Sequence, residues 1–218
     1  MGLFIVFEGI EGCGKTTQIA LLGDFLRKKN LPCIITREPG GTAVGDEIRK
    51  ILLNARNTEL LPATELLLYT ASKVQHLQHV IRPALSQGTV VLCDRFFDAT
   101  VAYQGYGGGV SLSLIREIHR AFLQAITPDV TVLLDCPVEV GLGRSRTRMK
   151  IEGKEQEEGR FEDKERAFHE RVRDGYMQLA RVEPERFFIV NGAQPAESVH
   201  RGICVFIAGK LKEKGYAV

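Results

Sequence analysis

The sequence contains no run of about 18 apolar residues, the length a membrane-spanning helix needs, and no repeat of fixed period. Its net charge is only +2, from 29 Lys and Arg against 27 Asp and Glu. This near balance argues against bulk electrostatic binding of nucleic acid or of an anionic membrane. The five cysteines lie far apart and form no CxxC pair. They indicate reduced thiols, and we therefore expect a cytoplasmic protein.

Short apolar runs alternate with helical patterns along the 218 residues. Each run is almost continuously apolar, which is typical of strands covered on both faces. Strands that alternate with helices predict an α/β fold with a parallel sheet. No Pro- or Ser-rich linker divides the chain, so we expect one domain over residues 1–218. Strands are predicted at 3–7, 33–36, 89–93, 130–134 and 187–190, and helices at 15–29, 60–87, 111–124, 137–149, 161–182 and 196–212.

A phosphate-binding loop is the most specific motif. Residues 9–16 match G-x-x-x-x-G-K-[ST] in full, directly after a predicted strand and at the start of a predicted helix. The glycines allow successive backbone N–H groups to face an anion. Lys15 would reach the β- and γ-phosphates, and the Thr16 hydroxyl would bind Mg²⁺. These features predict an NTP-binding loop in a P-loop NTPase-type fold.

Two aspartates that follow buried strands compete to complete the magnesium site. Asp94 is followed at once by Arg95, and this pair can serve a metal and a phosphate or form a structural ion pair. Asp135 precedes a helix with Pro137 in its first turn, so we expect Asp135 to cap that helix. The GTPase patterns D-x-x-G and N-K-x-D are absent from the sequence.

A second anion site is indicated by arginines near neighbouring strand ends. Arg37 precedes a Glu-Pro-Gly-Gly turn, Arg49 lies on the next helix, and Arg95 follows another strand. Two phosphate sites that face each other imply phosphate-to-phosphate transfer. Residues 144–166 are crowded with charge of both signs and form either a solvated surface segment or a mobile lid that carries arginines to a ligand. His76 and His79 lack a third metal ligand at matching spacing and are expected to be ordinary core or surface residues.

Together these residues resemble the thymidylate kinase family over nearly the whole chain. The resemblance rests on the P-loop, on Thr-Arg-Glu-Pro-Gly-Gly-Thr at 36–42, on Asp-Arg-Phe at 94–96, on Ala-Tyr-Gln-Gly at 102–105 and on the arginine-rich segment. It implies a five-stranded parallel sheet with helices on both faces, a small lid at about 144–166 and a single nucleoside monophosphate kinase domain. It also implies Mg²⁺-dependent transfer of the γ-phosphoryl of ATP to dTMP, giving dTDP and ADP for dTTP synthesis, in a homodimer. The P-loop contains no arginine, which is similar to the bacterial-type arrangement whose lid supplies the arginines.

The resemblance also implies site residues. The catalytic set is Lys15, Asp94, Arg95, Arg148 and Arg160, and the metal ligands are Thr16 and Asp94. The ATP-binding set is Gly9, Ile10, Glu11, Gly12, Cys13, Gly14, Lys15, Thr16, Thr17 and Arg144, with residues 191–195 near adenine. The dTMP-binding set is Glu11, Arg37, Glu38, Pro39, Arg49, Tyr69, Lys73, Arg95, Thr100, Tyr103 and Gln104. In it Glu11 meets the 3′-hydroxyl, Tyr103 crowds the ribose 2′ position, and Thr100 and Gln104 face the base.

Three positions depart from the family's usual residues. Tyr69 stands where Phe commonly stacks on thymine, Lys73 where Arg binds the base carbonyl, and Thr100 where Ser is common. Lysine keeps a donor but lacks the planar fork of arginine, so we expect looser fixation of the base. A kinase of another pyrimidine monophosphate, or an ATP-binding regulatory protein without turnover, remains an alternative.

Overall fold

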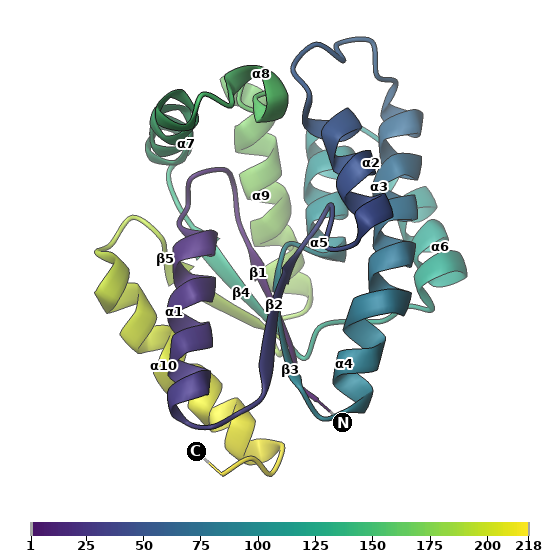
Figure 1. The fold of residues 1–218 in the computed structure, drawn as a ribbon. Helices are drawn as coiled ribbons and strands as arrows, with labels where there is room; N and C mark the ends of the chain where they lie inside the picture. Colours follow the sequence, from purple (N-terminus) through teal and green to yellow (C-terminus); the bar gives the residue numbers. More distant parts are fainter. Residues whose placement is uncertain (1, 218) are drawn as a thin grey trace.

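The computed structural model describes residues 2–217 and contains one parallel five-stranded sheet (Figure 1). Its order is β2-β3-β1-β4-β5, so the chain leaves β1 toward one edge and later returns to the other. The strands are β1 (Phe4–Glu8), β2 (Cys33–Arg37), β3 (Val90–Asp94), β4 (Val130–Asp135) and β5 (Phe187–Asn191). The five predicted strands and their parallel arrangement are confirmed.

Helices connect the strands and cover both faces of the sheet (Figure 1). Two apolar clusters lie on the two faces, and β1 alternates between them, with Ile5 and Phe7 in one and Phe4 and Val6 in the other. Each fully buried side chain of this size stabilises the fold by about 1.5–3 kcal/mol. The helices are α1 (Lys15–Lys28), α2 (Ala43–Leu53), α3 (Pro62–His76), η1 (Leu77–Ile81), α4 (Arg82–Ser86), α5 (Phe97–Thr100), η2 (Val101–Gly107), α6 (Leu112–Leu123), α7 (Val138–Glu152), α8 (Glu155–Glu158), α9 (Arg166–Val182) and α10 (Ala196–Glu213).

The edge strands correct one expectation. Burial on both faces is right for β1, β3 and β4 but wrong for β2 and β5, where Ile35 and Ile189 are each 45% exposed. A strand at the edge lacks one neighbour, and its flanking helices cover it incompletely. In β2 the exposed side chain of Ile35 also lines the cavity described below.

The charged segment 144–166 is largely helical. It comprises the second half of α7, the short α8 and the turns that lead to α9, above the carboxyl ends of the strands (Figure 1). Arg160, Phe161 and Glu162 in these turns are buried, so this part of the segment is not a solvated surface loop.

The first turn of α7, which precedes this segment, is packed tightly against the P-loop. A Cβ atom on Gly12 would lie 2.0 Å from the carbonyl oxygen of Gly141 in the first turn of α7, and one on Gly141 would lie 2.5 Å from the carbonyl oxygen of Glu11. Gly12 also has a left-handed backbone, with φ +64°, that favours glycine. Backbone therefore meets backbone at this contact, with no room for a side chain on either side.

Asp135 does not cap α7, contrary to the expectation from sequence. The residue before that helix is Pro137, which has no side-chain group to cap it, and Asp135 accepts no hydrogen bond from the described first turn. Asp135 instead accepts two hydrogen bonds from the guanidinium of Arg173 on α9, at 2.6 and 2.8 Å. A bidentate pair fixes both partners, so this carboxylate ties β4 to α9.

Candidate active site

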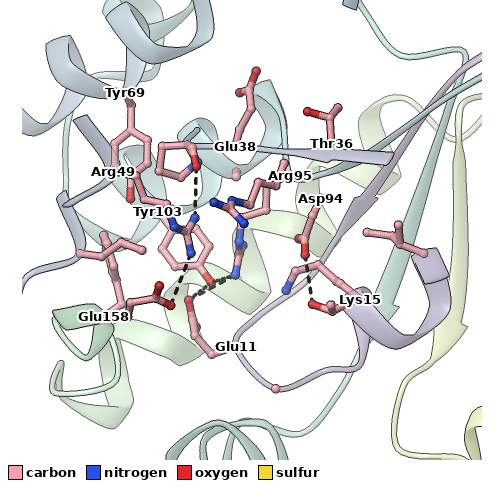
Figure 2. A pocket seen from close by; sticks show the side chains of 18 of the residues that line it. Glu11, Lys15, Thr36, Glu38, Arg49, Tyr69, Asp94, Arg95, Tyr103 and Glu158 are labelled. Atoms are coloured by element: carbon pink, nitrogen blue, oxygen red, sulfur yellow. Dashed lines mark hydrogen bonds and ion pairs between the residues drawn. The ribbon is translucent and has the colours of Figure 1, made fainter. Parts of the chain in front are cut away.

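A cavity of about 550 Å³ lies at the carboxyl ends of β1, β2 and β3 (Figure 2). It is lined by most of the predicted site residues, which are Glu11, Gly12, Lys15, Thr16, Arg37, Glu38, Pro39, Arg49, Tyr69, Lys73, Asp94, Arg95, Thr100, Tyr103, Gln104 and Arg148. The predicted residues outside its lining are Gly9, Ile10, Cys13, Gly14, Thr17, Arg144 and Arg160. The edge of a parallel sheet where strands end is the usual place for a ligand in such folds.

The P-loop forms the floor at one end of the cavity. Gly9, Gly12 and Gly14 all have positive φ, which turns the chain sharply between β1 and α1. The Lys15 amine folds back over the loop and donates to the carbonyl oxygens of Gly9 and Ile10, at 3.1 and 2.9 Å. The loop and the amino end of α1 thus form a concave, positive surface for an anion.

Thr16 and Asp94 meet beside the P-loop. The Thr16 hydroxyl donates to Asp94 Oδ2 at 3.3 Å, and Figure 2 shows Asp94 next to Lys15. Hydroxyl and carboxylate oxygens are ligands that Mg²⁺ accepts, and the ion usually keeps its other positions for phosphate and water. Within residues 2–217 no cluster of three or more His, Cys, Asp or Glu could enclose a metal by itself. The pair fits a magnesium ion that arrives with a phosphate.

Arg95 is held between two tyrosine–glutamate pairs. Its guanidinium donates to the hydroxyls of Tyr176 and Tyr103, each at 2.9 Å. Tyr176 donates in turn to Glu8 at 2.6 Å, and Tyr103 donates to Glu11 at 2.6 Å. Arg95 itself has φ +68°, an unusual backbone for a non-glycine residue. The two tyrosines and Glu11, whose Oε1 lies 3.3 Å from the guanidinium, fix this cation in the wall of the cavity (Figure 2).

The pKa values of the two glutamates in this network are shifted in opposite directions. Burial raises the pKa of Glu8 to about 7, although Arg95 opposes the shift. Burial also acts to raise the pKa of Glu11, but His169, Arg95 and Tyr103 outweigh it and lower that pKa to about 2. His169, fully buried on α9, places its Nδ1 3.3 Å from Glu11 Oε2. Glu11 therefore brings a fixed negative charge to the cavity.

A second buried network lies behind the Glu-Pro-Gly-Gly turn. Glu38 is 3.1 Å from the Lys73 amine and 2.9 Å from His76 Nδ1, and His76 Nε2 is 2.6 Å from the Thr36 hydroxyl. His76 is buried, in agreement with the expected core role, whereas His79 is exposed. The Lys73 amine thus lies against Glu38, a carboxylate of the protein. The predicted role of Lys73, a contact with a base carbonyl, did not include this partner.

A third network closes the far end of the cavity. The Gln104 amide nitrogen donates to Glu65 Oε1 at 2.7 Å. The other oxygen of Glu65 pairs with the guanidinium of Arg160, which also donates to the Leu52 carbonyl. Tyr69 is buried at this end and packs one ring face toward the Lys73 amine. The guanidinium of Arg160 is therefore held by α3 and by the end of α2, and not by the P-loop.

The other predicted arginines make contacts on several different elements. Arg148 lines the cavity from α7, 3.4 Å from the Ser145 hydroxyl. Arg144 donates to the Gly192 carbonyl at 2.9 Å, which joins α7 to the 191–195 loop. Arg49 donates to the Pro39 carbonyl at 3.1 Å, and Arg37 lies 3.3 Å from Asp46.

Sequence reasoning missed the partners that hold these residues. They are Glu8, Glu65, Tyr176 and His169, and the bonds they make join positions 39 to 168 residues apart. Tyr176 and His169 lie on the buried face of α9, where a periodic pattern looks the same for a core residue and for a site residue. The only signal in the sequence was the charged Glu8 at the end of an otherwise apolar strand.

Comparisons with known proteins agree on one family. The family model described as thymidylate kinase matches residues 7–203. A thymidylate kinase from Trichlorobacter lovleyi is 55% identical over 196 residues, which are 89% of this chain and 92% of that protein. A thymidylate kinase from Geotalea uraniireducens is 49% identical over 98% of this chain and 100% of its own length. The crystal structure of a thymidylate kinase from Ehrlichia chaffeensis has a TM-score of 0.74 and 32% identity, and the match covers 95% of this chain and 98% of that chain. In residues 2–217 no helix is both long and apolar enough to cross a membrane.

Proposed function

We propose that this chain, which belongs to the thymidylate kinase family and phosphorylates dTMP to dTDP with ATP, does so in the cavity at the ends of β1, β2 and β3. The observation that carries the proposal is Arg95, a fixed cation in the wall of the cavity that also contains the P-loop lysine. Phosphoryl transfer depends mainly on positioning and on positive charge around the transferred group. The product would supply dTTP synthesis.

The donor site is the P-loop. Backbone N–H groups of residues 9–17 would hold the ATP phosphates, with Lys15 reaching the transferred group after leaving the carbonyl oxygens it now binds. The contact between Arg144 and the 191–195 loop supports an adenine site at that loop. Thr16 and Asp94 would hold Mg²⁺, which supplies positive charge to the phosphate oxygens when bound.

The acceptor site occupies the rest of the cavity. Arg95 and Arg49 would bind the dTMP phosphate, with Arg37, Glu38 and Pro39 beside it. Glu11 would accept a hydrogen bond from the 3′-hydroxyl, and the position of Tyr103 against it would crowd a 2′-hydroxyl. At the far end Tyr69, Lys73, Thr100 and Gln104 would surround thymine.

The lid, residues 144–166 of a single kinase domain, would supply the remaining positive charge. Arg148 already lines the cavity and is the favoured catalytic arginine. Arg160 would have to leave Glu65 to take part. Closure of such a segment would exclude water and strengthen each charge interaction at the transferred phosphoryl group.

The enzyme would act as a cytoplasmic homodimer. Helices α2, α3 and α6 lie together on one side of the molecule (Figure 1), and each exposes large apolar side chains. These side chains are Val44, Ile51, Leu67, Leu114 and Phe122. Large exposed apolar side chains on neighbouring helices are typical of a protein interface. Sedimentation of the purified protein would show a dimer, and Leu67→Glu with Phe122→Glu would shift it to monomer.

A coupled ADP-release assay with dTMP, dUMP, UMP and CMP tests the acceptor assignment. We expect the highest kcat/KM for dTMP, a lower value for dUMP and very low values for UMP and CMP. Thymine and uracil differ by one methyl group, which separates them by about 1–3 kcal/mol. Turnover of CMP or UMP at the rate of dTMP would favour the alternative of a different pyrimidine kinase, and no ADP release would favour a regulatory protein.

A further inference from the structure

Gln104 presents one end of its side-chain amide to the protein and the other to the cavity. Its amide nitrogen donates to Glu65 Oε1 at 2.7 Å. Gln104 is only 3% exposed, lines the cavity, and its carbonyl oxygen accepts no hydrogen bond from the described residues 2–217. Glu65 lies behind it and is not part of the cavity lining.

The direction of this amide is set by its neighbour. A carboxylate only accepts hydrogen bonds, so the group that faces Glu65 must be the NH₂ end of Gln104. The other oxygen of Glu65 is occupied by Arg160, a guanidinium that only donates. Both carboxylate oxygens of Glu65 thus accept hydrogen bonds, one from Gln104 and one from Arg160. If the Gln104 amide were reversed, its carbonyl oxygen would face a carboxylate oxygen with no proton between them.

We propose that Glu65 is a specificity-determining positioning residue, which holds the Gln104 carbonyl oxygen toward the cavity so that the site selects a pyrimidine carrying N–H at ring position 3. This inference rests on the proposed acceptor site, in which Gln104 faces the base, and it deepens that site by naming the residue that sets the direction of the Gln104 amide. Thymine and uracil have a hydrogen on that nitrogen, whereas the same nitrogen of cytosine is an acceptor. A fixed carbonyl therefore binds the first two and repels cytosine.

Lys73 is poorly placed to make this distinction alone. Its amine lies 3.1 Å from Glu38 Oε2, with 4% of the side chain exposed, so it already has a charged partner. The Gln104 carbonyl oxygen, by contrast, can accept a hydrogen bond from a ring N–H but not from a ring nitrogen without hydrogen.

The variant Glu65→Gln tests the proposal because it keeps the size of the side chain. Facing Arg160, the new amide turns its carbonyl to the guanidinium and its NH₂ to Gln104. Gln104 then reverses and presents NH₂ to the cavity. We expect the ratio of kcat/KM for dTMP to that for dCMP to fall about 10- to 100-fold, since a wrongly paired buried group has a cost of that size. The value for dCMP itself should rise.

Arg160→Gln is the matched control. It breaks the same ion pair but leaves the Glu65 carboxylate in place, so the dTMP to dCMP ratio should stay unchanged whatever happens to kcat. Glu65→Ala also removes the acceptor and should lower the ratio as well. This second variant keeps the test valid if Glu65→Gln misfolds, and thermal melting shows whether each protein is folded. An unchanged ratio in both Glu65 variants, or an equal fall in Arg160→Gln, would overturn the inference. If the unmodified enzyme shows no preference for dTMP over dCMP, the acceptor site itself is misassigned.

Discussion

The two ends of the cavity are built in different ways. At the P-loop, one continuous segment of the chain supplies the backbone, the lysine and the hydroxyl, and the lysine bonds to residues five and six positions away. At the acceptor end, β2, α3, η2 and α9 all contribute side chains, and the bonds that hold Arg95 span 8 to 84 residues. The first is a local backbone structure, and the second is an assembly of buried polar contacts.

This difference predicts different responses to substitution. A local loop keeps its shape when one side chain is removed, so a variant there should lose chemistry and keep its fold. In a buried network each group satisfies another, so removing one leaves a partner unpaired at a cost of about 1–3 kcal/mol. Substitutions at the acceptor end should therefore change stability and affinity together.

The largest effect is expected at the P-loop, for Lys15→Ala. The amine contacts only carbonyl oxygens and the Cys13 sulfur of its own loop, so folding and dTMP affinity should be nearly unchanged. Loss of a preorganised positive charge at the phosphoryl group should lower kcat roughly 10²-fold or more. Steady-state kinetics and calorimetric titration with dTMP measure the two quantities. A variant with normal kcat would show that this loop is not the donor site.

Glu8 gives the next largest effect, on stability and its pH dependence. Its folded-state pKa of about 7 lies above the ordinary value of 4.5. Protonated Glu8 therefore favours the folded state, and its stabilising contribution is lost as the pH rises from 4.5 through 7, by about 1.4 kcal/mol per unit. Glu8→Gln does not titrate, so the stability of the native protein relative to this variant should fall by about 3 kcal/mol over that window.

Urea unfolding of both proteins at pH 5 to 8 measures this difference. Glu11, with its pKa lowered to about 2, shifts stability in the opposite direction and only between pH 2 and 4.5. It does not enter the measured window. A stability difference that is constant with pH would mean that Glu8 is ionised throughout, as its three hydrogen-bond donors would favour.

Arg148→Met should have an intermediate effect and tests the lid. Arg148 lines the cavity, whereas Arg144 bonds to the 191–195 loop. We expect kcat and kcat/KM for dTMP to fall together, roughly 10-fold or more, because the charge acts on the transition state. Arg144→Met should instead raise KM for ATP. Normal turnover in Arg148→Met and in Arg160→Gln together would exclude both of these arginines as catalytic groups of the lid.

Tyr176→Phe should have the smallest effect and measures how well the acceptor network tolerates one missing bond. It removes the hydroxyl between Arg95 and Glu8 but leaves Tyr103 and Glu11 in place. We expect dTMP to bind about 10-fold more weakly and stability to fall by about 1 kcal/mol, with ATP affinity unchanged. Equal losses of affinity for ATP and dTMP would point to general distortion instead.

The same difference explains what could be predicted from sequence. The strands, their parallel direction and the P-loop depend on short-range patterns, and the apolar runs together with Gly9 to Thr16 were sufficient. The edge exposure of β2 and β5 depends on strand order, which no local pattern contains. Asp135 was misread as a cap because its partner, Arg173, lies 38 residues away. The roles of Glu65, His169 and Tyr176 follow only from distances between helices that the sequence does not contain.

The close contact between Gly12 and Gly141 has a practical consequence for protein engineering. No side chain fits on either side, so neither position 12 nor position 141 can carry a label or a cross-linking residue. Gly153, at the end of the same helix, has open space around it, but its left-handed backbone, with φ +67°, would strain any other residue. Ile151 lies on the helical part of α7 and is 81% exposed. A fluorophore meant to report on lid motion therefore belongs at position 151, ten residues from the point where α7 packs against the nucleotide loop.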